Sequence, residues 1–486
     1  MRTALCTDHY ELTMLDAALR SGVAGHRAYF EVFARELPEG RRYGVVAGVA
    51  RVAEAIRHFS FGPDELDFLA ARRVVSEGTL QWLERFRFSG TVVAYPEGEL
   101  YFPGSPVLGV EAPFGEAVLL ETVVLSILNF DSAVAAAASR MVLAARGRPV
   151  IEMGARRTHE QAAVDAARAA YLAGFGSTSD LEAGRRYGIP TAGTVAHAFV
   201  LAHASEGDAF AAQLDTLGPG TTLLVDTYDV EAGITEAVLR ARQVGVAGPG
   251  AIRLDSGDLL TGSFAARKLL DDLGARDTRI VATSDLDEHA IERLAEAPID
   301  AFGVGTRLVT GSGAPTAGFI YKLVAIAREP SAVAPLEPVA KRSMHKETLP
   351  GAKGAWRVHD ADGRALAELV VSLPGSSEPT VDQLGRAGSA LAAAWTDRGS
   401  QLRALQKPVL LAGREVEQCT LDAARAWHRE ALAGLGPSAA ATAPGRPALH
   451  TVSASLGALD DADGALAIAT EAAAAADRER WEIRCR

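Results

Sequence analysis

Short apolar runs alternate with helical patterns through the middle of the chain. The clearest apolar runs end in small or acidic residues: TTLLVDTYD (221–229), GAIRLDSGDL (250–259), TRIVATSDLD (278–287) and IDAFGVGTRL (299–308). Helical patterns such as TGSFAARKLLDDLG separate them, at strand-to-strand intervals of roughly 28 residues for the first two and somewhat less for the third. RPVIEMGARR and GIPTAGTVAH fit the same scheme upstream. About six βα units in a row favour a closed or nearly closed α/β barrel over an open sheet.

The flanking segments have a different pattern. Before the barrel, DHYELTMLDAALRSG and YGVVAGVARVAEAIRHF have helical periodicity, and short strands joined by Pro/Gly turns follow them. The predicted fold is therefore α/β, an irregular βα barrel preceded by an N-terminal α/β domain. We expect the N-terminal domain over residues 1–135, the barrel over 136–350 and a C-terminal region over 351–486. An Ala/Pro-rich linker is predicted near 431–450.

Composition narrows the class of protein. The net charge of -12 over 486 residues argues against a general binder of nucleic acid or of membrane surfaces. The N-terminus lacks the features of a signal peptide, and no stretch is of the membrane-spanning type. The three cysteines, Cys6, Cys419 and Cys485, are scattered, which fits a reducing cytoplasm and gives no zinc signature. We therefore expect a cytoplasmic protein.

Polar side chains collect where the predicted strands end, and a βα barrel gathers its functional groups there. This rule selects Arg156, Arg157, His197, Asp226, Asp229, Arg253, Asp255, Asp258, Ser284, Asp285, Gly303, Gly305 and Thr306. Arginine binds phosphate with two parallel hydrogen bonds, glycine lets backbone N–H groups approach oxyanions, and carboxylates hold Mg²⁺ or ribose hydroxyls. The set suits a phosphorylated substrate with a divalent metal, although the sequence singles out no metal ligands.

Each candidate also has a structural interpretation. GVGTR can be a tight turn, and Asp255 can cap a helix. His203 fits a structural or solvated residue, and Tyr10 fits the core as well as a site. His197 follows Gly-Thr at a strand end and has a carboxylate on the next strand, which makes it a candidate nucleophile or base.

Eight motifs together resemble nicotinate phosphoribosyltransferase. In order along about residues 5–350 they are TDHYELTM, EMGARRT, GFGSTSD, GTVAHAFV, VDTYD, RLDSGDL, TSDLDE and FGVGTRLVTGSGAPTAGFIYKL. The resemblance implies an enzyme with the type II phosphoribosyltransferase barrel, classed as ligase and glycosyltransferase. It would join nicotinate to 5-phosphoribosyl-1-diphosphate, giving nicotinate mononucleotide and diphosphate, in the salvage route to NAD. It further implies Mg²⁺, ATP hydrolysis through a phosphohistidine, and a homodimer.

The resemblance also implies roles for single residues. His197 would be the phosphorylated histidine, oriented by Asp226. Arg253 would face the diphosphate, and Asp255 the ribose or the metal. Arg156 would lie near the pyridine, and Tyr10 of the other subunit would stack on it. The remaining substrate-binding candidates are Thr194, Gly303, the 5-phosphate residues Ser284, Asp285, Gly305 and Thr306, and the phosphate-site residue Lys322.

One position bears on the choice of base. Relatives that use nicotinamide carry an aspartate where this chain has Ser179, and a hydroxyl can donate to the carboxylate of nicotinate whereas an aspartate would repel it. They also carry an acid at the position of Ala196. The alternatives are a nicotinamide or quinolinate phosphoribosyltransferase, a barrel lyase or aldolase acting on a sugar phosphate through a strand-end lysine, and a non-catalytic phosphosugar-binding subunit.

Overall fold

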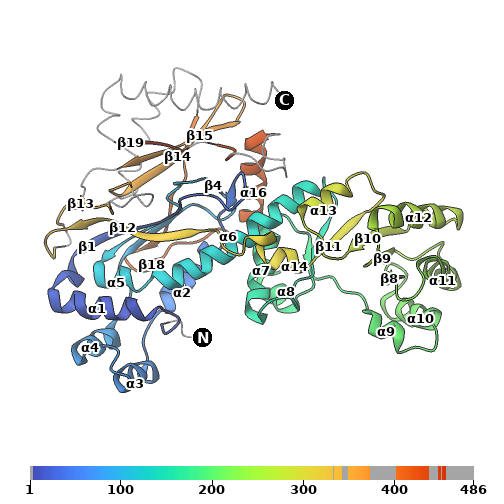
Figure 1. Ribbon diagram of the computed structural model, residues 1–486, viewed down its shortest axis with the longest axis horizontal. Coiled ribbons are helices and arrows are strands. Elements are labelled where there is room, and N and C mark those ends of the chain that lie inside the picture. Colours follow the sequence, from blue (N-terminus) through green and yellow to red (C-terminus); the bar gives the residue numbers. More distant parts are fainter. Residues whose placement is uncertain are drawn as a thin grey trace. The chain divides into compact units, whose positions relative to one another are not determined.

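The computed structural model describes residues 4–331, 333–341, 349–372, 401–436, 447–449 and 451–455. They fall into two compact units: Met1–Ala133 with Thr316–Arg486, and Val134–Pro315 (Figure 1). The 24-residue helix α6 (Glu121–Ala144) runs from the first unit into the second. Residues 316–350 thus cluster with the N-terminal segment, whereas the sequence assigned them to the barrel. The predicted domain limits stay a prediction, and residues 437–446 of the predicted linker lie outside the described residues.

The second unit is built on a parallel sheet of six strands in the order β7-β6-β11-β10-β9-β8. The strands are β6 (Val150–Glu152), β7 (Ser177–Thr178), β8 (Thr222–Leu224), β9 (Ala251–Leu254), β10 (Arg279–Thr283) and β11 (Ala301–Val304). Every pair of neighbours is parallel, as the βα spacing predicts. β7 and β8 are the two edges, so within the described residues the barrel is irregular and no strand pair closes it.

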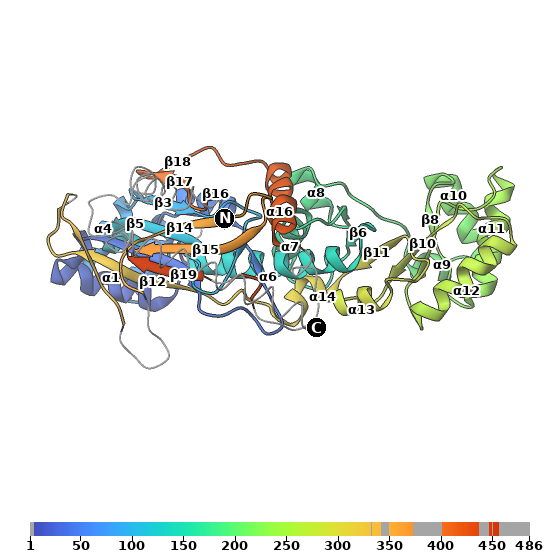
Figure 2. The ribbon, with the colours of Figure 1, turned by 90° about the horizontal axis from the view of Figure 1, so that it is seen from above.

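Helices follow the strands of this sheet along the chain. They are α7 (Glu160–Leu172), α8 (Leu181–Tyr187), α9 (His197–Leu201), α10 (Glu206–Leu217), α11 (Val230–Gln243), α12 (Leu259–Asp272), α13 (Glu288–Arg293) and α14 (Thr306–Val309). Figures 1 and 2 show α10, α11 and α12 beside one another, outside strands β8 and β9. This is the covering layer that a parallel sheet requires.

The acidic residues after the strands separate into two groups. Asp229, Asp258 and Asp287 are the N-caps of α11, α12 and α13, and their carboxylates accept backbone N–H groups of the first turn. Asp226 and Asp255 cap no helix and are free for another task. Capping therefore accounts for the second aspartate of the RLDSGD motif, Asp258, while the first, Asp255, stays a candidate site residue.

The first unit contains two larger antiparallel or mixed sheets and a two-stranded pair. The seven-stranded sheet has the order β13-β12-β1-β5-β3-β17-β18, and the four-stranded sheet has the order β16-β14-β15-β19. The strands are β1 (Arg27–Ala34), β2 (Gly44–Val45), β3 (Thr91–Ala94), β4 (Leu100–Tyr101), β5 (Leu108–Pro113), β12 (Phe319–Ala327), β13 (Leu336–Pro338), β14 (Lys353–His359), β15 (Ala365–Ser372), β16 (Gln401–Ala404), β17 (Lys407–Leu411), β18 (Arg414–Glu415) and β19 (Thr451–Ser455).

Helices cover the larger sheet and bury its core. They are α1 (His9–Ser21), α2 (Val49–His58), α3 (Pro63–Ala71), α4 (Glu77–Arg85) and α5 (Phe114–Val118), with short 3₁₀ turns at Val23–Gly25 and, in the second unit, Gly311–Gly313. Helix α16 (Leu421–Leu435) instead contacts β4 and β15. α6 is long and apolar enough to cross a membrane, but 67% of its most apolar stretch is buried inside the protein. It therefore has the burial of a core helix.

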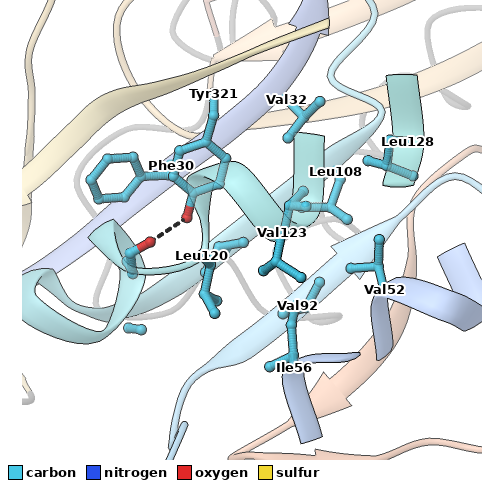
Figure 3. Packing of buried hydrophobic residues seen from close by; sticks show 14 of the residues in the cluster. Phe30, Val32, Val52, Ile56, Val92, Leu108, Leu120, Val123, Leu128 and Tyr321 are labelled. Atoms are coloured by element: carbon cyan, nitrogen blue, oxygen red, sulfur yellow. Dashed lines mark hydrogen bonds between the residues drawn. The ribbon is translucent and has the colours of Figure 1, made fainter. Parts of the chain in front are cut away.

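Tyr321 anchors this core on one side of the sheet. Its ring stacks on Phe30, with 4.8 Å between the ring centroids, and its hydroxyl donates to the carbonyl oxygen of Ala117 at 2.9 Å (Figure 3). Burial raises the pKa of the Tyr321 hydroxyl well above its ordinary value, so the group is a neutral donor.

Replacing Tyr321 by phenylalanine is expected to lower the free energy of unfolding by about 1 kcal/mol. The ring contact remains, while a buried hydrogen bond is lost; the Ala117 oxygen keeps a second donor, the backbone N–H of Leu120. Urea unfolding of the two proteins measures the difference. No loss of stability would show that this hydrogen bond contributes nothing.

Candidate functional site

A cavity of about 550 Å³ lies within the barrel unit. Its walls come from β6, β8, β9 and β10 and from the segments that follow β6 and β7. The lining residues are Ile151, Met153, Ala155, Arg156, Ser179, residues 191–196, Gly220, Thr221, Thr222, Arg253 and Val281. The volume is that of a small-molecule site, and the lining combines apolar side chains with two arginines and several hydroxyls.

The alternation of side chains along β6 determines which of them face the cavity. Ile151 and Met153 line it, whereas Val150 and Glu152 are buried away from it. Gly303 on the neighbouring strand makes room for this arrangement. A Cβ atom there would lie 2.5 Å from Thr283 Cγ2 and 2.7 Å from Met153 Sδ, so only glycine fits.

His197 is the first residue of α9 and lies between two carboxylates. Its Nε2 is 3.9 Å from Asp226 Oδ1 and 3.8 Å from Asp255 Oδ2, while its Nδ1 is 3.1 Å from Thr227 Oγ1. The side chain is 40% exposed, which leaves it accessible to a ligand. The structure thus brings together the histidine and the two aspartates that the sequence selected from three separate segments.

Asp226 is a buried carboxylate with one oxygen available. Its side chain is 2% exposed, and Oδ2 accepts hydrogen bonds from Asp255 N at 2.8 Å and Ser256 Oγ at 2.7 Å. Oδ1 is buried and has no hydrogen-bond partner among the described residues. A buried, unpaired carboxylate oxygen is costly unless it meets a proton donor or a cation. It therefore provides the acceptor that a nearby imidazole N–H or a metal ion needs.

Arg253 and Asp255 lie side by side at the end of β9. The Arg253 guanidinium donates to Thr194 Oγ1 at 3.3 Å and lies 3.8 Å from Asp255 Oδ2, while Thr283 Oγ1 donates to Asp255 Oδ1. The buried Nε of Arg253 has no hydrogen-bond partner among the described residues. Arg253 lines the same cavity as Arg156 and Ser179. The guanidinium is therefore a cationic group in the wall of this cavity.

The predicted 5-phosphate residues lie on two adjacent loops. Ser284 and Asp285 follow β10 and are exposed, and Gly305 and Thr306 follow β11. Because β10 and β11 pair in parallel, both loops leave the same edge of the sheet. α14 is a single short turn, so any phosphate contact here rests on the loop backbone and the side chains of these residues.

Tyr10 and Lys322 belong to the first unit and share a neighbour. Lys322 Nζ lies 3.9 Å from Glu121 Oε1, and the Tyr10 hydroxyl is hydrogen-bonded to the same carboxylate. Burial, followed by this hydrogen bond, raises the pKa of Tyr10. The Tyr10 side chain is nonetheless 46% exposed, so an aromatic face is available for a ligand.

Sequence reasoning missed several residues that the structure places beside these groups: Ile151, Met153, Val281, Thr227, Glu121, Val195, and the stretches 191–193 and 220–222. The alternation in VIEM could have indicated that Ile151 and Met153 share one face. Glu121 carries no such signal, because it lies far from both Tyr10 and Lys322 in the sequence.

Glu206, the first residue of α10, lies beside the carboxylates of Asp226, Asp229 and Glu236. Burial first, and then repulsion from these groups, raises the pKa of Glu206 from 4.5 to about 7. Below about pH 4.5 this carboxyl group is protonated in both the folded and the unfolded protein, so its burial costs no charge. As the pH rises from about 4.5 through about 7, ionisation of the group increasingly favours the unfolded protein, and the fold loses stability.

Replacing Glu206 by glutamine should therefore raise the melting temperature at pH 8 by roughly 1–2 °C, and the difference should vanish toward pH 5. Thermal unfolding at the two pH values measures it. Asp208→Asn, at an exposed position in the same first turn of α10, is the matched control and should show no such rise. An equal effect of Glu206→Gln at both pH values would contradict the assigned cause.

The chain is similar to known proteins over most of its length. Residues 5–129 match the nicotinate phosphoribosyltransferase (NAPRTase) N-terminal domain. Nicotinate phosphoribosyltransferase pncB1 of Mycobacterium tuberculosis is 50% identical over 455 residues, covering 92% of this chain and 94% of its own length. The Bacillus subtilis nicotinate phosphoribosyltransferase is 38% identical over 375 residues, covering 75% and 76%. The crystal structure of human nicotinic acid phosphoribosyltransferase superposes with a TM-score of 0.75 and 26% identity, covering 92% and 97%.

The second unit has a curled parallel sheet with a basic cavity, and the chain superposes on the human structure. The fold is therefore that of a type II phosphoribosyltransferase. The extent and identity of the sequence matches then determine the family. The chain belongs to the nicotinate phosphoribosyltransferases.

Proposed function

We propose that this enzyme transfers the phosphoribosyl group of 5-phosphoribosyl-1-diphosphate to nicotinate, giving nicotinate mononucleotide and diphosphate in the salvage route to NAD. We further propose that it works in the cytoplasm, uses Mg²⁺, and hydrolyses ATP through a phosphohistidine. The observation that carries the proposal is the barrel cavity lined by Arg156, Arg253 and Ser179, because three donors around an apolar wall suit an aromatic carboxylate.

Base recognition follows from the lining of the cavity. Met153 and Val281 offer apolar surface to the pyridine ring, and the arginines offer N–H donors to the nicotinate carboxylate. The reaction breaks the bond between the anomeric carbon and diphosphate while the pyridine nitrogen bonds to that carbon. Since the transition state has oxocarbenium character, the protein's tasks are positioning and charge stabilisation. Arg253 is central to both, since it brings a positive charge to the wall of the cavity.

His197 is the proposed phosphate acceptor from ATP. The geometry that supports this is the pair of carboxylate oxygens within 3.9 Å of its Nε2. In the proposed arrangement Thr227 holds Nδ1, and the buried carboxylate of Asp226 fixes the orientation of the ring. The free oxygen of Asp226 and the carboxylate of Asp255 are the oxygen donors that Mg²⁺ prefers, and the ion would neutralise charge on the leaving diphosphate.

The remaining predicted roles complete the proposed site. The 5-phosphate would be held by Ser284, Asp285, Gly305 and Thr306. Gly303 would let β11 lie close to Thr283 and Met153. Thr194 would contact substrate beside Arg253. We propose a homodimer in which Tyr10 of the other subunit stacks on the pyridine and Lys322 contacts a phosphate.

The lyase or aldolase alternative is disfavoured by the barrel itself. Its only lysine between residues 134 and 315 is Lys268, which lies on α12 with its side chain 77% exposed and paired with Asp272 at 2.5 Å. No strand end therefore offers an amine for a Schiff base. Product formation from phosphoribosyl diphosphate, Mg²⁺ and nicotinate tests the proposed reaction. Turnover of quinolinate or nicotinamide in place of nicotinate would overturn it.

Replacing Ser179 by aspartate is expected to lower kcat/KM for nicotinate about 100-fold, equivalent to about 2.7 kcal/mol, because two carboxylates would then face each other in the cavity. Ser179→Ala is the matched control and should cost about tenfold, since it removes one hydrogen bond without adding charge. Steady-state kinetics with varied nicotinate measures both. Equal effects of the two variants would show that Ser179 does not face the carboxylate.

A further inference from the structure

Glu152 is a buried carboxylate beside the cavity that no proposed step uses. It is the last residue of β6, its side chain lies in the core at 1% exposure, and the alternation of the strand turns it away from the cavity. No ion pair among the described residues includes it. Burying a carboxylate without a cation costs free energy that an apolar side chain at this position would not cost. The hydrogen bonds of Glu152 indicate a positional role for it.

Both carboxylate oxygens of Glu152 hold backbone segments that carry cavity residues. One oxygen accepts from the backbone N–H of Gly154, which begins the turn leading to Arg156. The other accepts from the hydroxyl of Thr178, the last residue of β7. The Glu152 backbone oxygen accepts from Ser179 N at 2.8 Å. A single residue thus contacts the two strand ends from which Arg156 and Ser179 enter the cavity.

Thr178 extends this connection along β7. While its hydroxyl donates to Glu152, the same oxygen accepts from Asp180 N at 2.9 Å, and Asp180 caps α8 by accepting from Ala183 N at 2.8 Å. Ser179 therefore lies between two residues whose conformations are fixed. Burial raises the pKa of Glu152, and the hydrogen bond from Thr178 acts in the opposite direction.

The turn after Glu152 also fits closely against the loop after β11. Met153 N donates to Val304 O at 2.8 Å, and a Cβ atom on Gly305 would lie 3.0 Å from Met153 O. A Cβ atom on Gly154 would lie 2.4 Å from Val309 Cγ1 and 2.9 Å from Glu152 Oε1. The end of β6 has no room to shift without moving its neighbours.

We propose that Glu152, acting with Thr178, is a positioning residue for base recognition: it sets the spacing between Arg156 and Ser179 across the cavity. The inference rests on the proposed function, since it assumes that these two side chains bind nicotinate. It concerns orientation alone, because Glu152 itself does not touch the base.

Thr178→Val and Glu152→Gln test the proposal. Valine keeps the shape of threonine but cannot donate to Glu152. In Glu152→Gln the amide oxygen can still accept from Gly154 N, but the amide NH2 then faces Thr178 Oγ1, so the Thr178 hydroxyl loses the carboxylate as its acceptor. For both variants the expected result is a rise of about tenfold or more in the KM for nicotinate, with a much smaller change in kcat. Glu160→Gln, at an exposed position in the first turn of α7, is the matched control and should leave both constants unchanged.

A merely structural role predicts a different pattern: a smaller fraction of folded enzyme, a lower apparent kcat and an unchanged KM for nicotinate. That pattern in a folded Thr178→Val variant would overturn the inference. If Glu152→Gln fails to fold, Thr178→Val alone decides, because it retains the carboxylate. Absence of nicotinate turnover in the unmodified enzyme would instead refute the proposed function, so the two failures are distinguishable.

Discussion

Arg253→Ala is expected to lower kcat/KM for nicotinate about 1000-fold, equivalent to about 4 kcal/mol of transition-state stabilisation. The Arg253 side chain is 14% exposed, lines the barrel cavity and has an unpaired Nε beside a carboxylate that receives other hydrogen bonds. In the proposed site its removal takes a cation from the cavity that would bind negatively charged substrate groups. Steady-state kinetics with each substrate varied in turn measures the loss.

Two companion variants make this result specific. Arg253→Lys should recover only part of the activity, because lysine keeps the charge but lacks the planar fork of donors. Arg279→Ala removes an exposed arginine at the opposite end of neighbouring strand β10 and should leave activity nearly unchanged. Full activity of Arg253→Ala would show that this cavity is not the substrate site. Equal losses in the two alanine variants would indicate a general effect of charge.

His197→Ala is expected to abolish ATP hydrolysis and the stimulation of the reaction by ATP, while slow phosphoribosyl transfer persists. The imidazole is the proposed phosphate acceptor, but the cavity residues proposed to position nicotinate remain in place without it. Measuring diphosphate release with and without ATP, together with phosphate released from ATP, separates the two activities.

His203→Ala is the matched control for that variant. His203 Nδ1 lies 2.7 Å from Phe199 O, and its ring packs on Phe199 at 4.5 Å between centroids, so its contacts are local to α9. It should retain ATP stimulation. Complete loss of transfer in a folded His197→Ala enzyme would contradict the role of this histidine as an energetic coupler, since the chemistry itself would then need it.

The barrel unit could be predicted from the sequence because its order is local. Each strand of the βα repeat is followed by its own helix, so the spacing of the apolar runs is enough to predict that the strands are parallel. The strand ends could be predicted for the same reason, and His197, Asp226 and Asp255 do come together. The sequence left open whether Asp255 caps a helix, and the structure assigns that task to Asp258.

The first unit could not be predicted in this way, because its main sheet pairs distant segments. β12 lies antiparallel to β1 with Phe33 opposite Ile320, and β17 pairs with β3. Nothing in either segment specifies such a partner, since hydrophobic alternation sets the face of a strand and not its neighbour. For the same reason the roles of Glu121 and Glu152 could not be predicted, because they depend on contacts with residues of other segments.

The most direct test of the account is a competition in one vessel. Equal concentrations of nicotinate and nicotinamide would be supplied with phosphoribosyl diphosphate and Mg²⁺, with and without ATP, and both mononucleotides would be quantified by mass spectrometry. The account predicts nicotinate mononucleotide almost exclusively, in an amount that ATP increases. Predominance of nicotinamide mononucleotide, or a yield of nicotinate mononucleotide indifferent to ATP, would contradict it.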